Sequence, residues 1–268
     1  MIFLLGRAVR DRVLRIGCSA AEAALAGVGV EPPEVLMLLG HMRSGSTLLL
    51  HLLINHPLIA GLGERNAFYR TPADFARFAI ATRVSQRLLL ARLRYIVDQI
   101  NHTRFTPDLA LLGHRRVRLL FLVRRPAAAI SSVLELSRFY GPTWSVQRSV
   151  DYYVERLDSL VHMARMQPGS ARATFMTYED LTERPRETLS RLQSMLSIEP
   201  AFSETYRIHE FTGRRGDPGA NIRSGRIGSA SPLAHPDLPP EEVERATRAH
   251  AACLEAMAPF ALMPQATS

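Results

Sequence analysis

Short apolar runs alternate with longer amphipathic stretches along most of the chain, from residue 35 onward. Nearly continuous apolar runs that end in polar or turn residues predict buried strands over 35–39, 117–123 and 173–178. Stretches with apolar residues at helical spacing predict helices. The predicted helices are 47–55, 75–99, 127–136, 144–166, 185–196 and one that begins at Pro240. Strands that alternate with helices indicate an α/β fold, a three-layer sandwich with a mainly parallel central sheet.

Both flanks of this alternating region have a different composition. Residues 1–33 place arginines between apolar residues at helical spacing, which predicts an N-terminal helical segment ahead of a single domain over 34–268. Part of this segment, residues 1–16, is also a candidate for peripheral membrane contact, because basic amphipathic helices bind lipid surfaces. Residues 211–240 are rich in Gly, Pro, Ser and Arg, and this composition predicts a long loop.

Composition excludes several classes of protein. Apolar residues make up 47% of the 268 residues, which excludes a disordered or fibrous chain. The two cysteines, Cys18 and Cys253, cannot build a disulfide framework or a thiolate metal site. No apolar run approaches the roughly 18 residues of a membrane span. No signal-peptide cleavage site follows the N-terminal apolar residues, so we expect a cytoplasmic protein, and we expect no metal cofactor.

The cationic residues are all of one type. The net charge is +8, and all 33 cations are arginine, with no lysine in the chain. A bias of this kind is typical of GC-rich bacterial genomes, but its physical effect is a surface field that favours anionic partners. Guanidinium groups match phosphate and sulfate geometry with two parallel hydrogen bonds. The arginines are dispersed and form no recognition helix, so we expect no nucleic-acid partner.

The first candidate binding motif is the segment 39–48, which follows a predicted strand and opens a predicted helix. Backbone N–H groups at such a turn cradle an anion, and the helix dipole adds to the attraction. Gly40 and Gly45 have the spacing of an ATP-binding loop, but Ser46 stands where that loop carries lysine. The available cation is Arg43 instead, so the loop is expected to bind a phosphate ester other than the one an ordinary ATPase or kinase takes.

The second candidate motif follows the next predicted strand. Arg124 comes directly after that strand, and Ser132 lies eight residues further on in the helix that Pro126 opens. We expect Arg124 and Ser132 to lie near one another at the carboxyl edge of the sheet, where open α/β sheets bind ligands. Two anion sites on neighbouring strand ends predict a ligand with two separated phosphates.

Together and in this order, the two motifs resemble those of the sulfotransferase family, enzymes that use 3′-phosphoadenosine 5′-phosphosulfate (PAPS). Arg43 and Leu48 are similar to residues of Golgi tyrosylprotein and many bacterial members, whereas cytosolic members usually carry Lys and Trp there. The resemblance spans about residues 35–230. It implies a P-loop NTPase-like fold and transfer of a sulfuryl group from PAPS, with no metal.

The resemblance also implies which residues bind the nucleotide. The segment 43–47 is similar to the 5′-phosphosulfate loop of the family, and Arg124 with Ser132 is similar to its 3′-phosphate site. Tyr178, in a Tyr-Glu-Asp-Leu sequence, resembles a tyrosine that lies near the adenine. Residues 216–226 resemble the loop that covers the nucleotide, although the Arg-Lys-Gly run expected there is absent. The implied nucleotide-binding residues are Arg43, Ser44, Gly45, Ser46, Thr47, Arg124, Ser132, Tyr178, Arg223 and Arg226.

Two residues are candidates for the general base. Glu64 lies 21 residues after Arg43, as the base does in tyrosylprotein-type and many bacterial sulfotransferases. A carboxylate suits this role when burial raises its pKa. His102 lies 22 residues before Arg124, at the spacing of the catalytic histidine of cytosolic members, although the surrounding residues differ. The candidate catalytic residues are Glu64, Arg43 and His102, and the sequence leaves open whether Glu64 or His102 takes the proton.

The acceptor is expected to be a hydroxyl on a small molecule, a sugar of a glycan, or a lipid. Aromatic residues between the motifs either line an apolar acceptor pocket or fill the core. These are Phe68, Tyr69, Phe75, Phe78, Phe139, Tyr140 and Trp144. Two alternative functions fit part of the pattern. A P-loop nucleotide kinase or NTPase conflicts with Ser46. A non-catalytic anion-binding relative does not need the intact set of Arg43, Glu64, Arg124 and Ser132.

Overall fold

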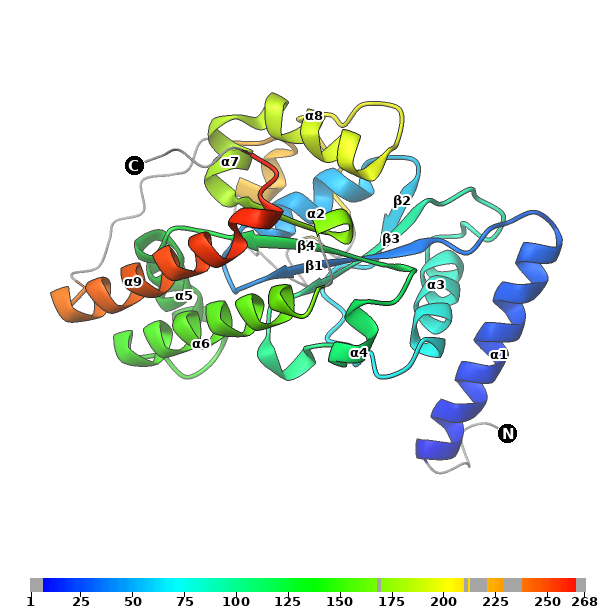
Figure 1. Ribbon diagram of the computed structural model, residues 1–268, viewed down its shortest axis with the longest axis horizontal. Coiled ribbons are helices and arrows are strands. Elements are labelled where there is room, and N and C mark those ends of the chain that lie inside the picture. The colour runs from blue at the N-terminus through cyan, green and yellow to red at the C-terminus, as the bar shows by residue number, and fades with distance from the viewer. Residues whose placement is uncertain (1–6, 168–169, 210–211, 213–220, 229–237, 264–268) are drawn as a thin grey trace.

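The computed structural model describes residues 7–167, 170–209, 212, 221–228 and 238–263. At its centre is a five-stranded sheet in the order β2-β3-β1-β4-β5, and all four strand pairings are parallel (Figure 1). The strands are β1 (Glu34–Gly40), β2 (Ile59–Gly61), β3 (Tyr95–Ile100), β4 (Val117–Val123) and β5 (Ala173–Thr177). The expected α/β class with a mainly parallel sheet is confirmed.

Helices cover both faces of this sheet. The α-helices are α1 (Arg7–Gly27), α2 (Ser46–Ile54), α3 (Ala73–Ser85), α4 (Leu109–Leu112), α5 (Pro126–Tyr140), α6 (Val146–Arg165), α7 (Tyr178–Glu183), α8 (Pro185–Leu196) and α9 (Pro240–Met257). Short 3₁₀ helices are η2 (Thr103–Phe105), η3 (Ser170–Arg172), η4 (Asn221–Ser224) and η5 (Ala258–Phe260). In Figure 1, α2, α7 and α8 lie on one side of the sheet, and α3, α4, α6 and α9 lie on the other.

The central strand β1 shows why the chain folds into three layers. Its side chains alternate, so that Val35, Met37 and Leu39 belong to one buried apolar cluster while Leu36 and Leu38 belong to the other. All five side chains are fully buried, because each face of the strand is covered by helices. This double burial is the physical reason for the continuous apolar run in the sequence.

The strand register brings the candidate motifs to one edge. Leu39 in β1 pairs with Ile100 in β3, and Gly40 pairs with Leu122 in β4. The loops that follow β1, β3 and β4 therefore leave the sheet side by side at its carboxyl edge.

One predicted helix was wrong over most of its length. The expected helix over 75–99 is instead α3, which ends at Ser85, followed by a loop and by strand β3. Asp98 and Gln99 interrupt the apolar residues of this strand, although both side chains are buried. Buried polar residues make a strand hard to predict from its apolar pattern. The strand β2 was also missed, because three residues are too few to show a pattern of apolar and polar positions.

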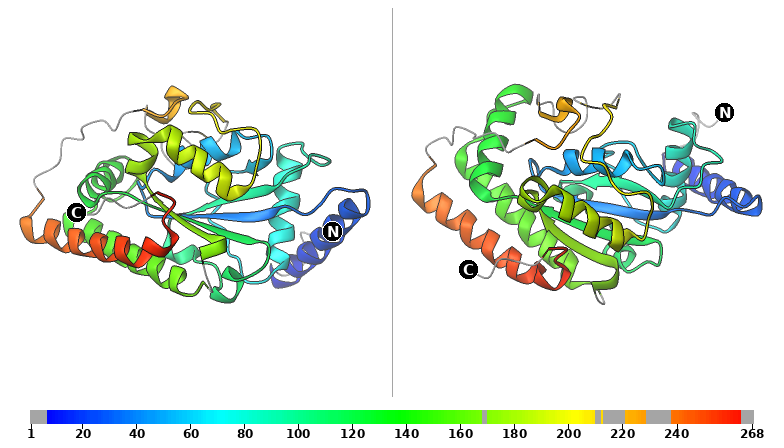
Figure 2. Two further views of the ribbon diagram at one scale, coloured as in Figure 1. Left: turned by 45° about the horizontal axis from the view of Figure 1, so that its top comes forward. Right: turned by 90° about the horizontal axis from the view of Figure 1, so that it is seen from above.

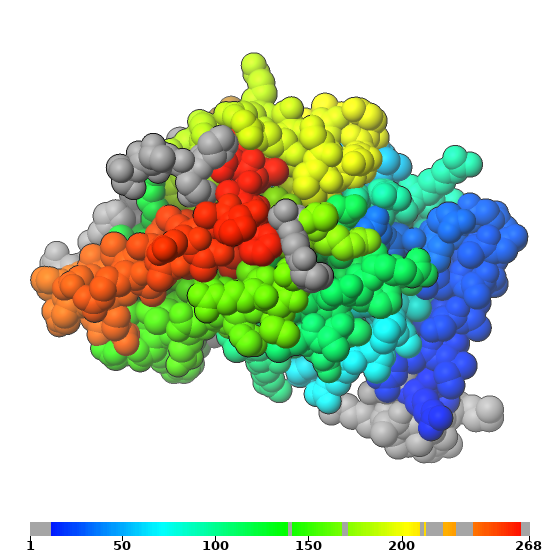
Figure 3. Space-filling model, in the orientation of Figure 1, coloured from blue at the N-terminus to red at the C-terminus, as the bar shows by residue number. Residues whose placement is uncertain are grey.

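Helix α1 lies at one end of the molecule and packs along α3, far from α9 in every view (Figures 2 and 3). Its contacts include ion pairs of Glu22 with Arg116 at 2.7 Å and of Arg15 with Asp74 at 3.5 Å. Residues 1–6 of the predicted membrane-contact segment lie outside the described residues. Among the helices that the structure describes, none is both long enough and apolar enough to cross a bilayer.

Candidate active site

The loop between β1 and α2 includes two residues with left-handed backbone conformation. Arg43 has φ of 65° and Gly45 has φ of 89°, both in the left-handed region. A Cβ on Gly45 would lie 2.2 Å from the ring of Tyr178, so only glycine fits there. The Ser44 hydroxyl is buried and has no hydrogen-bond partner among the described residues. A glycine-shaped cradle with a free buried hydroxyl at a helix N-terminus is suited to bind an anion.

Hydrogen bonds from neighbouring strand ends hold this loop in place. The Met42 N–H donates to the Tyr152 hydroxyl at 2.8 Å, and that hydroxyl donates to the carbonyl of Asn101 at 2.8 Å. The ring of His41 donates from Nδ1 to the Met42 carbonyl and accepts the Arg124 N–H at Nε2. Burial lowers the pKa of His41 to about 3, so the ring stays neutral and keeps both roles.

The structure brings the two predicted anion-binding motifs together. Arg43 Nε donates to the Ser132 hydroxyl at 2.7 Å, and Arg124 Nη1 donates to the carbonyl of Arg43 at 3.3 Å. The Arg124 guanidinium lies 4.3 Å from the ring centroid of Tyr178, the ring that also faces Gly45. Residues from four separate segments thus form one cationic cluster at the carboxyl edge, as their order in the sequence predicted.

The predicted covering loop is described only in part. Arg223 in η4 and Arg226 are exposed. Their segment is held by Tyr206, whose hydroxyl donates to the Ile222 carbonyl at 3.1 Å. Residues 213–220 and 229–237 of the loop lie outside the described residues, so the nucleotide contacts expected of Arg223 and Arg226 stay predictions.

The two candidate bases lie against each other. Glu64 Oε1 is 3.7 Å from His102 Nε2, and the exposed fractions of the two side chains are 14% and 38%. That carboxylate oxygen has no hydrogen-bond partner among the described residues. Burial and the nearby charge of Asp98 raise the pKa of Glu64 to about 7. Burial lowers the pKa of His102, and the charge of Arg156 lowers it further.

A second buried carboxyl group, Asp98 in β3, supports this arrangement. Asp98 accepts a hydrogen bond from the Tyr69 hydroxyl at 2.7 Å and is only 1% exposed. Burial raises the pKa of Asp98 to about 6, while the Tyr69 hydroxyl and the Arg65 guanidinium lower it. The charge of Asp98 disfavours the ionised form of Glu64 and so contributes to its raised pKa.

Arg156 in α6 is a site residue that the sequence analysis missed. Its side chain is fully buried, and it donates to the carbonyl of Gly40 at 2.8 Å and to that of Ile100 at 2.7 Å. These are the last residues of β1 and β3, so one guanidinium joins the two strand ends. An arginine inside an amphipathic helix gives no sequence signal of this role, because most such arginines face solvent.

Comparison with known proteins agrees with this geometry. Residues 94–204 match the sequence model described as the sulfotransferase family, a range that holds His102, Arg124 and Ser132. This part of the chain, about two fifths of its length, is similar to the sulfotransferase family. The match confirms the resemblance of the motifs to the sulfotransferase family and supports sulfuryl transfer. No curated protein sequence matches the chain significantly.

Solved structures of sulfotransferases are similar to this chain to different degrees. One from Mycobacterium tuberculosis H37Rv superposes with a TM-score of 0.51 at 15% identity, over 90% of this chain and 82% of its own. The sulfotransferase domain from the curacin biosynthetic pathway gives 0.47 at 15% identity, over 82% of this chain and 97% of its own. A mouse sulfotransferase complexed with PAP gives 0.49 at 12% identity, over 83% and 85%. The first match confirms the P-loop-like α/β fold expected of this chain.

Proposed function

We propose that this sulfotransferase moves the sulfuryl group of PAPS to a hydroxyl of a small-molecule, glycan or lipid acceptor, with Glu64 as the general base. The observation that carries the proposal is the junction of Arg43, Ser132 and Arg124, which unites two anion sites at the carboxyl edge of the sheet. The Tyr152 hydroxyl links this junction, through Met42, to the strand end beside His102. Donor and proton acceptor are thus on adjoining parts of one site.

The residues present fit a nucleotide with separated phosphates. The cradle at Gly45, the buried Ser44 hydroxyl and the side chains of Ser46 and Thr47 suit the 5′-phosphosulfate end. Arg124 and Ser132 suit the 3′-phosphate, because a guanidinium gives a phosphate charge-assisted hydrogen bonds that are stronger than neutral ones. PAPS supplies an activated sulfuryl group, bonded through oxygen to its 5′-phosphate.

The protein residues supply position, charge and a proton acceptor. The acceptor oxygen forms a bond to sulfur as the bond from sulfur to the 5′-phosphate oxygen breaks, and that oxygen keeps the electron pair. Arg43 and the loop amides stabilise the charge that develops there, as in phosphoryl transfer. Glu64 takes the acceptor proton and becomes a neutral carboxylic acid, a form that its buried position favours.

His102 takes a different part in this scheme. Because its pKa is lowered, the ring is neutral at pH 7 and can donate or accept one hydrogen bond. At 3.7 Å from Glu64 Oε1, it orients the carboxylate toward the acceptor. The alternative, in which His102 is the base and Glu64 orients it, is separated from this one by the variants treated in the Discussion.

Turnover with PAPS tests the function directly. The enzyme is incubated with PAPS and pooled hydroxyl acceptors, and products are read by mass spectrometry as the gain of one sulfuryl group. We expect turnover of PAPS to 3′-phosphoadenosine 5′-phosphate (PAP). Tight binding of PAP without turnover of any acceptor contradicts the proposal and favours the non-catalytic anion-binding alternative.

Discrimination for the 3′-phosphate is expected to be strong. PAP should bind about 10- to 150-fold more tightly than AMP, because loss of charge-assisted hydrogen bonds costs about 1.5–3 kcal/mol. The Arg124→Gln variant should lose most of this difference. Arg125→Gln is the matched control, since Arg125 is exposed and pairs with Glu183 at 3.5 Å instead. Calorimetry that gives equal affinities for PAP and AMP would remove the assigned roles of Arg124 and Ser132.

The rate is expected to depend on the ionisation of Glu64. Since its pKa is raised to about 7, the base is protonated and inactive on the acid side. We expect kcat/KM to fall about tenfold for each pH unit below this value and to level off above it. Asp98→Asn removes the charge that raises this pKa. In this variant the acid limb of the profile, which is the pH range where kcat/KM falls, should therefore move to lower pH. If kcat/KM of the unaltered enzyme begins to fall only below pH 6, this result contradicts the assignment of Glu64 as the general base.

A further inference from the structure

Aromatic rings lie close to the candidate base. The Phe105 N–H donates to the His102 carbonyl at 3.0 Å, and the ring of Phe105 lies 5.1 Å from that of Phe68. Phe68 is 46% exposed, although it is apolar and only four residues beyond Glu64. On the other side of His102, the ring of Tyr152 lies at 6.3 Å and that of Trp144 lies 5.7 Å from Tyr152.

Other aromatic residues near this segment have a different role. Tyr69, Phe75 and Phe78 are at most 2% exposed and belong to the apolar core, so they do not line an acceptor site. The side chains of Phe139 and Tyr140 lie outside the described part of the chain. Of the aromatic candidates that the sequence analysis gave, Phe68 and Trp144 therefore remain beside the site.

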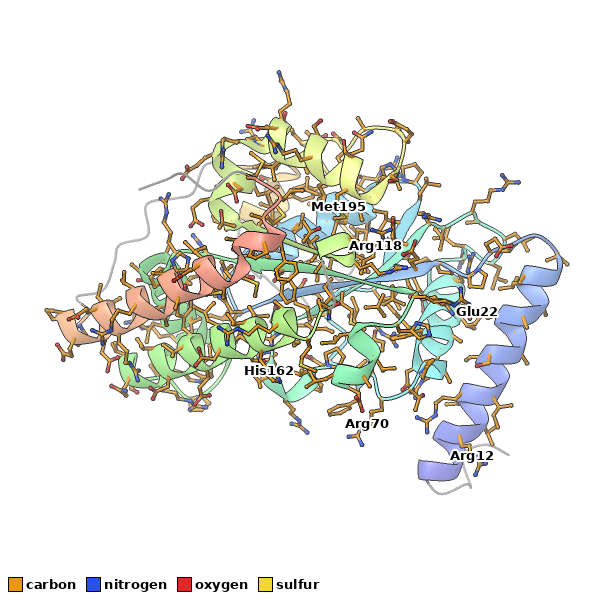
Figure 4. All side chains as sticks on the ribbon, viewed as in Figure 1. Arg12, Glu22, Arg70, Arg118, His162 and Met195 are labelled. Carbon is orange, nitrogen blue, oxygen red and sulfur yellow. The ribbon has the colours of Figure 1, made fainter. Side chains whose placement is uncertain are left out.

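Each of these outer rings carries an arginine. The guanidinium of Arg70 lies 5.3 Å from the ring centroid of Phe68, that of Arg104 lies 5.7 Å from Phe105, and that of Arg148 lies 4.4 Å from Trp144. Figure 4 shows Arg70 at the edge of the molecule, below α4. We call this set of three rings and three arginines the acceptor rim; it consists of Phe68, Arg70, Arg104, Phe105, Trp144 and Arg148.

The acceptor rim carries positive charge that local carboxylates leave unbalanced. In the described part of the chain, Arg70, Arg104 and Arg148 form no ion pair, whereas most arginines around β1, such as Arg116, pair with glutamate. Asp108, close by in the sequence, accepts the Ala110 N–H as the cap of α4. A guanidinium that lies over a ring can still donate hydrogen bonds from its N–H groups to an anion.

We propose that the acceptor of this sulfotransferase carries an anionic group, such as a carboxylate, beside an apolar or aromatic body. This inference rests on the proposed function and narrows its acceptor class. The rings contact the apolar body and exclude water, while the arginines bind the anionic group. The acceptor hydroxyl then faces Glu64 and His102, which lie next to the rim along both chain segments.

The same rim gives selectivity against neutral acceptors. A neutral analogue makes the ring contacts but leaves the arginines to water, so it binds less tightly. Arg65 differs from the rim arginines, because it lies beside Asp98 and is engaged in that buried network. The anion selectivity should therefore follow the three exposed arginines and not Arg65.

The test uses the only tryptophan of the chain as a reporter. Trp144 fluorescence is titrated with 4-phenylbutyrate and with its neutral amide, in the presence of PAP. Both probes lack a hydroxyl, so binding is measured without any transfer. We expect the carboxylate to bind at least about tenfold more tightly than the amide, and the difference to shrink as salt rises. The Arg104→Gln and Arg70→Gln variants should each reduce it about threefold.

Arg165→Gln is the matched control, because Arg165 is exposed and is the last residue of α6, at the other end of that helix from Arg148. It should leave both affinities unchanged. Equal binding of the carboxylate and the amide to the unaltered enzyme overturns the inference. The inference is also overturned if Arg165→Gln reduces the affinity difference between carboxylate and amide as much as the rim variants do. That result would show only a general attraction of anions to the surface. Failure of PAPS turnover is a separate result and bears on the proposed function alone.

Discussion

Replacing Glu64 with glutamine is expected to slow sulfuryl transfer by about 100- to 10,000-fold, the usual contribution of a general base. Glutamine keeps the size of the side chain and its hydrogen-bonding reach, but it cannot take the acceptor proton. The affinity for PAP should stay unchanged, because the nucleotide contacts assigned here come from other segments. Steady-state kinetics with PAPS and calorimetry with PAP measure the two quantities.

His102→Gln is the companion variant. If Glu64 is the base and His102 orients it, this change should lower kcat less and keep the acid limb set by Glu64. The reverse result, a nearly active Glu64→Gln enzyme and an inactive His102→Gln enzyme, would make His102 the base. If both variants stay active, the proton leaves to water and neither residue is a catalytic base.

The parts of the site that the sequence predicted are those that local chemistry determines. The loop over 41–45 needs glycine at 45 and follows a buried strand, and both features are visible in a short stretch of residues. Arg124 was placed correctly because parallel strands deliver their carboxyl ends to one edge. The contact of Arg43 with Ser132 follows from that geometry, since the register of β1 and β4 puts their loops side by side.

The parts that the sequence could not predict depend on burial. Strand β3 was taken for helix, because Asp98 and Gln99 interrupt its apolar residues, and only the fold shows that both are enclosed. The same enclosure sets the pKa of Glu64, which no sequence pattern reports. Arg156 lies 116 residues from Gly40, the carbonyl that it binds, so its role depends wholly on how α6 packs against the sheet.

Replacing Arg156 with methionine is expected to lower the free energy of unfolding by about 2–6 kcal/mol, since it leaves two buried carbonyls without a donor at about 1–3 kcal/mol each. Methionine fills most of the same volume, so the loss reports the hydrogen bonds more than a cavity. The guanidinium is charged at pH 7, although burial lowers its pKa to about 10. Chemical denaturation followed by tryptophan fluorescence measures the change.

The same variant is expected to move the pH profile. The charge of Arg156 lowers the pKa of Glu64, so removing it should raise that pKa further above 7 and shift the acid limb of kcat/KM upward. Arg156→Lys separates the two effects, because lysine keeps the charge but lacks the planar fork that reaches both Gly40 and Ile100. The lysine enzyme should therefore lose stability while its acid limb stays near that of the unaltered enzyme. Unchanged stability in the methionine variant would show that other donors satisfy the two carbonyls. An unchanged acid limb in that variant would show that Arg156 joins the strand ends without acting on the base.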